Sequence, residues 1–150
     1  MRAVALAGLL AACAYRPGSF TGPEGPFPGQ YATTGCLDVA VGAAEDPAAT
    51  GQVVELHVAN RCDHAVTIDL RAVRARGRDT AGRERVLAAY DPQHEIRPLP
   101  LEARQVAREV IELQVVGAAR TPLVSACLDV AALGGAAGPR EVCLTSERVP

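Results

Sequence analysis

The chain has 150 residues, 49% of them hydrophobic, and a formal net charge of −2. This length and apolar content indicate one folded domain rather than disorder, and the charge disfavours nucleic-acid binding, which usually needs a strong basic excess. Trp is absent and aromatic residues make up only 3%, so the core must be built from Val, Leu, Ile and Ala.

The first twelve residues have the pattern of an export signal. Arg2 is followed by an apolar stretch from Ala3 to Ala12. As a helix this stretch would reach about 15 Å, against roughly 30 Å of bilayer hydrocarbon, so it is too short to span a membrane. Its length is that of a signal peptide, and we expect residues 1–12 to serve as one.

The stretch closes with Leu10-Ala11-Ala12-Cys13. This tetrapeptide resembles the lipobox of bacterial lipoproteins, in which small residues precede a cysteine that is acylated and becomes the new N-terminus. The resemblance implies lipidation of Cys13 and attachment to a membrane of the bacterial cell envelope. It favours the outer membrane, because many such lipoproteins that stay in the inner membrane have Asp where this chain has Ala14. The alternatives are an ordinary secretory signal with an incidental cysteine and a cytosolic chain.

A Pro/Gly-rich segment follows, and we expect residues 13–35 to be a tether. Pro17, Pro23, Pro26 and Pro28 alternate with glycines, a composition that holds no hydrogen-bond ladder and is semi-extended and pliable. Such a tether would lift a domain formed by residues 36–150 off the bilayer. Its aromatic residues, as an alternative, form a contact segment for a partner; they are Tyr15, Phe20, Phe27 and Tyr31.

Period-two alternation of apolar and polar residues predicts strands in the rest of the chain. Leu37, Val39 and Val41, for example, share one face opposite Asp38. We expect about seven strands, over 36–43, 52–60, 64–75, 83–90, 108–116, 123–131 and 140–146. Their number and spacing predict an all-β fold, a single immunoglobulin-like or related antiparallel β-sandwich stapled by two disulfides. Residues 101–110 could instead form a helical turn or two.

With Cys13 set aside, four cysteines remain, and four allow three disulfide connectivities. Directly opposed residues of a hairpin have a constant sum of residue numbers. Pairing Cys127 with Cys143 centres the turn on Gly135 and also brings apolar residues of the two strands opposite each other. We therefore predict this pair.

The remaining pair is Cys36 with Cys62, whose turn would fall in the loop after Asp46-Pro47. Here the apolar faces disagree by one residue, so the pairing needs a bulge or strands in different sheets. Zinc is the alternative use of these cysteines. No C-x2-C pair exists and Cys62-Asp63-His64 is not a structural-zinc pattern, so we expect disulfides and no metal.

No catalytic signature is found in the sequence. Ser19, Ser125 and Ser146 lack a G-x-S-x-G context, and no H-E-x-x-H motif occurs. We expect the three histidines, His57, His64 and His94, to be surface residues. The chain is therefore predicted to be no enzyme and to use no cofactor.

Two segments are candidate binding sites. The long loop from Tyr90 to Leu101 mixes aromatic, charged and apolar groups, and long loops on a rigid β scaffold commonly carry function. Its candidate residues are Tyr90, Asp91, His94 and Arg97.

The second segment is an arginine cluster around the turn at 79–82, formed by Arg71, Arg74, Arg76, Arg78, Arg83 and Arg85. Its candidate residues are Arg74, Arg76 and Arg78. Such a cluster could bind anionic lipid headgroups, lipopolysaccharide or an acidic partner. The alternative is a solvated hairpin whose edge is protected from aggregation by charge.

Together these features predict a non-catalytic envelope lipoprotein that binds or scaffolds another envelope component, a protein or a glycan. An inhibitor of a periplasmic hydrolase and an accessory lipoprotein of a secretion machine are the alternatives. No nucleic-acid partner is expected.

Overall fold

A computed structural model describes residues 21–22, 25–26, 29–46, 48–91, 96–118, 120–135, 138 and 140–145. The expected signal peptide, Cys13 and His94 lie outside these residues. The strands in chain order are β1 (Thr21–Gly22), β2 (Gly25–Pro26), β3 (Gln30–Thr34), β4 (Leu37–Ala43), β5 (Gln52–Asn60), β6 (Val66–Ile68), β7 (Arg74–Asp79), β8 (Glu84–Ala89), β9 (Leu99–Leu101), β10 (Val106–Val115), β11 (Leu123–Asp129) and β12 (Glu141–Thr145). Two short helices are η1 (Leu70–Ala72) and α1 (Ala131–Gly134).

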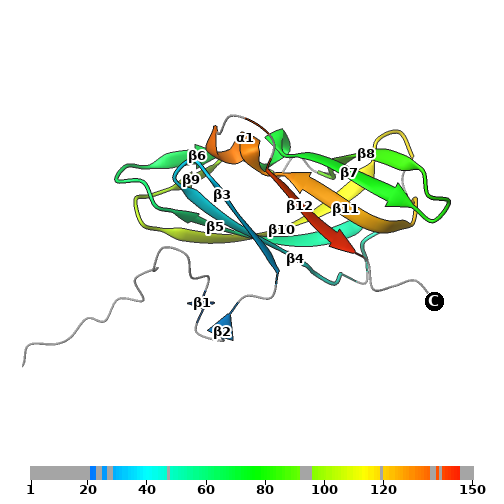
Figure 1. Ribbon diagram of the computed structural model, residues 1–150, viewed down its shortest axis with the longest axis horizontal. Coiled ribbons are helices and arrows are strands. Elements are labelled where there is room, and N and C mark those ends of the chain that lie inside the picture. Colours follow the sequence, from blue (N-terminus) through cyan, green and yellow to red (C-terminus); the bar gives the residue numbers. More distant parts are fainter. Residues whose placement is uncertain are drawn as a thin grey trace, which may run out of the picture.

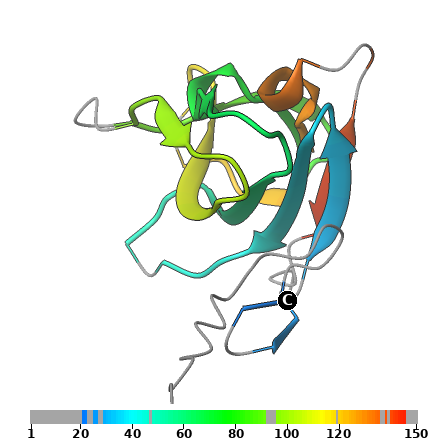
Figure 2. The same ribbon diagram turned by 90° about the vertical axis from the view of Figure 1, so that its left-hand side faces the viewer.

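Eight of the described strands form one antiparallel sheet, in the order β12-β11-β7-β8-β10-β5-β4-β3. The sheet rolls up around its core, and its two edge strands, β3 and β12, come to lie side by side (Figure 2). The pairs β1–β2 and β6–β9 form separate two-stranded sheets. The predicted antiparallel all-β class is confirmed, with more strands than the seven expected.

Aliphatic side chains fill the inside of the roll. The buried hydrophobic residues of the described chain include no Phe or Tyr, whereas Tyr31 and Tyr90 are 54% and 44% exposed. The alternation along each strand produces this core, because every second residue points inward. Central members are Val39, Val41, Val54, Leu56, Val58, Ile111, Leu113 and Leu128. The expectation of a core without large aromatic anchors is confirmed.

The seam between β3 and β12 is closed by side chains and by one close backbone approach. The backbone N–H of Cys143 donates to Oε1 of Gln30 at 3.3 Å. The hydroxyl of Thr34 donates to the carbonyl of Ala131 at 3.2 Å. Any side chain at Gly134 would collide with the carbonyl of Thr34, so glycine is needed for α1 to pack against the end of β3. These contacts join both ends of β3 to β12 and α1.

Strand β3 lies in the segment expected to be a tether without a ladder. It pairs with β4 from Gln30↔Val41 to Thr34↔Leu37. The expectation that no ladder forms as far as Gly35 is therefore wrong for residues 30–34. The prediction extended the proline-rich character to the whole segment, although the prolines of this segment all precede Gly29.

The expected strand 64–75 is split into β6, η1 and β7. The cause is local: a carboxylate oxygen of Asp69 accepts from the backbone N–H of Arg71 at 3.0 Å, and this cap starts η1. Strand β6 then pairs with β9, a strand that was not predicted. In the segment 101–110 the structure has a turn at Ala103-Arg104 followed by β10, not a helix.

Both predicted disulfides are present, Cys36–Cys62 and Cys127–Cys143. In the ladder between β11 and β12, Cys127 lies opposite Cys143 and Leu128 opposite Val142. The register derived from the hairpin sum is confirmed.

The first disulfide needs neither a bulge nor strands in different sheets, so that expectation is wrong. Strands β4 and β5 pair in one continuous register, and both cysteines lie just beyond its end. A bend after β5 absorbs the mismatch of one residue: Oδ1 of Asn60 accepts from the backbone N–H of Cys62 at 2.8 Å.

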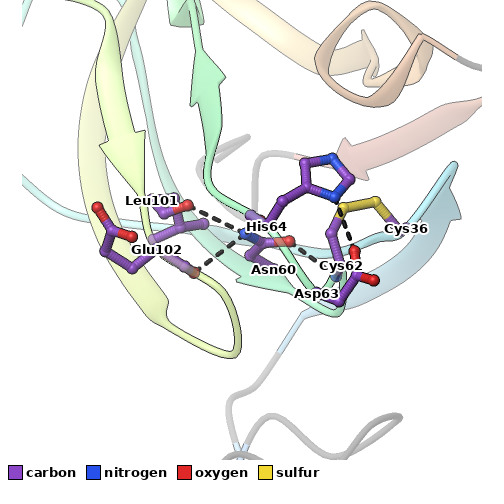
Figure 3. Close-up of polar contacts among 7 residues, drawn as sticks. All are labelled: Cys36, Asn60, Cys62, Asp63, His64, Leu101 and Glu102. Carbon is purple, nitrogen blue, oxygen red and sulfur yellow. Dashed lines mark hydrogen bonds and ion pairs between the residues drawn. A yellow bond between two sulfur atoms is a disulfide. The ribbon is translucent and has the colours of Figure 1, made fainter.

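Asn60 is fully buried and its side-chain amide joins two segments of backbone (Figure 3). Its Nδ2 donates to the carbonyls of His64, Leu101 and Glu102 at 2.9 to 3.0 Å. The amide therefore ties the disulfide-bonded bend to the turn between β9 and β10. The turn signal at 60–63 was visible in the sequence, but the burial of this amide was not.

We expect both disulfides to stabilise the fold by restricting the unfolded chain. For sequence separations of 26 and 16, loop-closure entropy corresponds to about 3.5 and about 3 kcal/mol. Replacing Cys36 and Cys62, or Cys127 and Cys143, with alanine should lower the free energy of unfolding by about these amounts in urea denaturation. Peptide mapping of the unreduced native chain checks the connectivity, and a crossed pattern would refute both pairs.

Candidate functional site

The predicted arginines lie on the outer face of β7. Arg74, Arg76 and Arg78 are exposed and alternate with three inward-pointing residues of the strand. Strand β7 is flanked by β11 and β8, and β8 by β10 (Figure 1). The hairpin is thus inside the sheet, and the expectation that the arginines protect a sheet edge is wrong.

Carboxylates neutralise part of this arginine cluster. Arg76 contacts Glu141 at 2.7 Å and Glu84 at 3.6 Å. Arg71, which lies just before β7, pairs with Asp69 at 2.9 Å. Arg78 makes no ion pair within the described residues. Arg74 lies opposite Asp129 in the β7–β11 ladder, and its charge adds to the backbone hydrogen bonds from Arg140 and Ala131 that lower the pKa of Asp129. The positive charge on the outer face of β7 is therefore least compensated at Arg78, and Arg74 makes no direct ion pair within the described residues.

Asp79, at the inner side of the β7–β8 turn, holds the other two arginines of the cluster. It is 2% exposed and accepts from the backbone N–H groups of Ala81 and Arg83 at 2.9 Å. The guanidinium groups of Arg83 and Arg85 reach its other oxygen at 3.0 Å. The backbone bond from Arg83, with these guanidinium groups, outweighs burial and lowers the pKa of Asp79 to about 2. Arg83 and Arg85 thus help to build the turn.

Exposed apolar side chains lie beside the arginines, on the outer faces of β8 and β10. Val86 is 70% exposed and lies opposite Arg76 in the β7–β8 ladder. Val116 is 60% exposed, and its backbone N–H donates to the carbonyl of Val86 at 3.0 Å. Val110, at 53%, lies further along the same face of β10. We call the surface formed by Arg74, Arg76, Arg78, Val86, Tyr90, Val110 and Val116 the β7–β8–β10 face.

Tyr90 connects the two predicted segments. It follows β8 directly, is 44% exposed, and its backbone N–H donates to the carbonyl of Glu112 on β10 at 2.7 Å. The loop that begins here is tied at its ends, because Oδ2 of Asp91 accepts from the backbone N–H of Ile96 at 3.2 Å. Arg97 is exposed beyond this point. The structure therefore brings the start of the predicted loop to the same face as the arginine row.

Sequence reasoning missed the three valines of this face. Each of them is next to a buried apolar residue, in the pairs Val86-Leu87, Val110-Ile111 and Val115-Val116. In a strand with one buried face, two adjacent apolar residues cannot both point inward. That adjacency is the signal that would have revealed them.

Within the described residues, no side chains are arranged for acid–base catalysis. His57 contacts Glu55 at 2.8 Å, and His64 contacts Asp63 at 2.8 Å, but no serine or cysteine thiol joins either pair. Burial opposes ionisation of Glu55, yet the hydrogen bonds from Arg108 and His57 lower its pKa. The hydrogen bond from His64 lowers the pKa of Asp63. Every resolved carboxyl shift in the described chain favours the charged form.

A groove of about 360 Å³ is lined by none of the residues that form the β7–β8–β10 face. The loop between β4 and β5, the start of β11 and Thr145 line it, with Glu45 and Asp46 as its charged groups. Glu112 holds this loop in place by accepting from the backbone N–H groups of Thr50 and Gly51 at 2.8 and 2.6 Å. The groove carries no histidine, cysteine or arginine in its lining.

Within the described residues, no group of three or more His, Cys, Asp or Glu side chains is placed to hold a metal ion. None of the helices in this part of the chain has the length and apolar character needed to cross a bilayer.

Comparison with protein families, with curated proteins and with solved structures finds no match to this chain.

We expect Asp79 to make the fold sensitive to acid. Its folded pKa of about 2 lies below the ordinary value of 3.8, so its contribution to stability is complete above that value and is lost as the pH falls toward the folded pKa. Asp79→Asn should therefore unfold at lower urea concentration near neutral pH, and its difference from the unsubstituted chain should shrink between pH 3.8 and about 2. Glu84→Gln, exposed on the same hairpin, is the control. A difference that stays constant over this pH range would contradict the assignment.

Proposed function

We propose that this chain is a lipid-anchored, non-catalytic binding protein of the bacterial cell envelope, and that its β7–β8–β10 face contacts another envelope component. One observation carries the proposal: apolar side chains up to 70% exposed lie beside a row of exposed arginines on one side of the sheet. Apolar patches with a polar rim mark interaction sites on soluble domains.

The chemistry of the other residues supports a binding role over catalysis. The charged side chains with resolved pKa shifts stabilise turns and ladders, as Asp79 and Glu112 do. A hydrolase would need a nucleophile beside a base that is free to accept its proton. The signal-like segment 1–12, the lipobox-like Leu10–Cys13 and Ala14 support an anchor in the outer membrane. An inhibitor or a secretion accessory would use the same kind of face and differs only in its partner.

Lipid anchoring is tested by substitution at the expected acylation site. We expect Cys13→Ser to move the protein from the membrane to the soluble fraction of the producing bacterium when membranes are washed at high salt, because the acyl chains supply the apolar area that holds it there and salt screens any charge contact. Ala14→Asp should keep the protein on membranes but move it to the inner-membrane fraction. Ser19→Ala is the control and should leave the distribution unchanged. Full membrane retention of Cys13→Ser would overturn the proposed anchor.

The binding face is tested by site-specific photo-crosslinking in intact cells. A photoreactive residue at position 86 or 90 should form reproducible adducts with one envelope component, because both side chains point outward from the face. The same residue at position 48, exposed in the loop between β4 and β5, is the matched control. Adducts at position 48 but not at 86 or 90 would refute the face as the contact surface.

A further inference from the structure

We propose that the β7–β8–β10 face rests on an anionic phospholipid bilayer, with Val86 and Val116 entering the headgroup region and Arg74 and Arg78 contacting phosphate groups. This inference rests on the proposed function, and it names the component that the face binds.

The chemistry of the face matches the boundary of a bilayer. Val86 and Val116 are 70% and 60% exposed and adjoin each other through the bond from the Val116 N–H to the Val86 carbonyl. Tyr90, whose ring has an apolar body and a polar tip, lies two residues beyond Ala88 on the same side of β8. Aromatic rings of this kind are enriched at the headgroup level of membranes, beside apolar side chains that go deeper.

The side chains beside the valines carry positive charge, which an anionic surface attracts. Arg78 makes no ion pair within the described residues, and Arg74 has none in direct contact there. In the ladders Glu84 lies opposite Arg78 and is drawn toward Arg76 at 3.6 Å, and Asp129 lies opposite Arg74 while accepting from two backbone N–H groups. Guanidinium groups bind phosphate through paired N–H donors, so the exposed guanidinium of Arg78, with that of Arg74 on the same face, provides a phosphate-binding row.

The shape of the face favours a bilayer over a protein groove. The rolled sheet makes its outer face convex (Figure 2). The groove found in the described chain is lined by the β4–β5 loop and the start of β11, and by none of the residues of this face. A convex surface with short apolar side chains enters a deformable headgroup layer without needing a complementary pocket. An anchor at Cys13 would hold this face near the membrane and raise its local concentration there.

The test uses the full chain with Cys13→Ser, so that no acyl chain contributes, and measures co-sedimentation with vesicles. We expect binding to vesicles of phosphatidylcholine and phosphatidylglycerol in equal parts, and none to phosphatidylcholine alone. Arg74→Gln or Arg78→Gln should each weaken binding about fivefold, since an arginine near an anionic surface contributes about 1 kcal/mol. Val86→Asp should weaken it about tenfold through lost apolar burial.

Three controls separate the contact from a general charge effect. Val106→Asp changes a valine that is 42% exposed on β10 outside the face, and it should bind as the parent chain does. Glu84→Gln removes a negative charge from the face and should bind more tightly. Circular dichroism of each variant checks that the fold is kept.

The possible outcomes distinguish this inference from the proposed function. Equal binding by Val86→Asp and Val106→Asp, or no binding to anionic vesicles at all, would overturn the bilayer contact. If position 86 then still crosslinks to an envelope protein in cells, the face binds a protein and the proposed function stands. If vesicle binding is found but Cys13→Ser stays fully on membranes in cells, the anchor is wrong while the contact remains.

Discussion

The aliphatic side chains that fill the core of the described residues set the geometry of this protein. Leucine, isoleucine and valine fill a narrow space well, and the buried hydrophobic residues of the described chain include no aromatic ring that would hold the walls further apart. The sheet therefore closes tightly on itself, and its edges meet at β3 and β12. Tight curvature makes the outer surface convex, and the alternation along β8 and β10 turns valines of both strands outward on it.

Most strands of the sheet could be predicted from the sequence, because the residue pattern that specifies a strand lies within the strand itself. The strand expected over 52–60 has the same bounds as β5, and the constant sum of residue numbers placed Cys127 opposite Cys143. Strand β3 was missed because its few residues follow a Pro/Gly-rich stretch and alternate only weakly. The break after β6 depends on one carboxylate, that of Asp69, capping a helical turn in competition with the ladder.

The candidate site could be predicted only in part, because its character depends on distant partners. The arginines were visible as a cluster, but which of them are neutralised was not. Arg76 meets Glu141, which follows it by 65 residues, and Arg83 and Arg85 are occupied by the buried Asp79. The loop after Tyr90 was recognised by length and composition, whereas its position beside the arginine row follows from the order of the strands. The valines of the face could be assigned to the outer side of the sheet only once the burial of their neighbours in the sequence was known.

The Cys36–Cys62 disulfide also controls how mechanical force passes through the domain. Tension on the chain before Gln30 acts first on β3, whose pairing with β4 begins at Gln30↔Val41. If β3 is pulled away, the force reaches Cys36 and crosses the covalent bond directly to Cys62. Residues 37–61, which hold β4 and β5, then lie in a closed loop that carries no tension. A pull on the N-terminal side can therefore remove one edge strand of the roll while these two central strands keep their ladder.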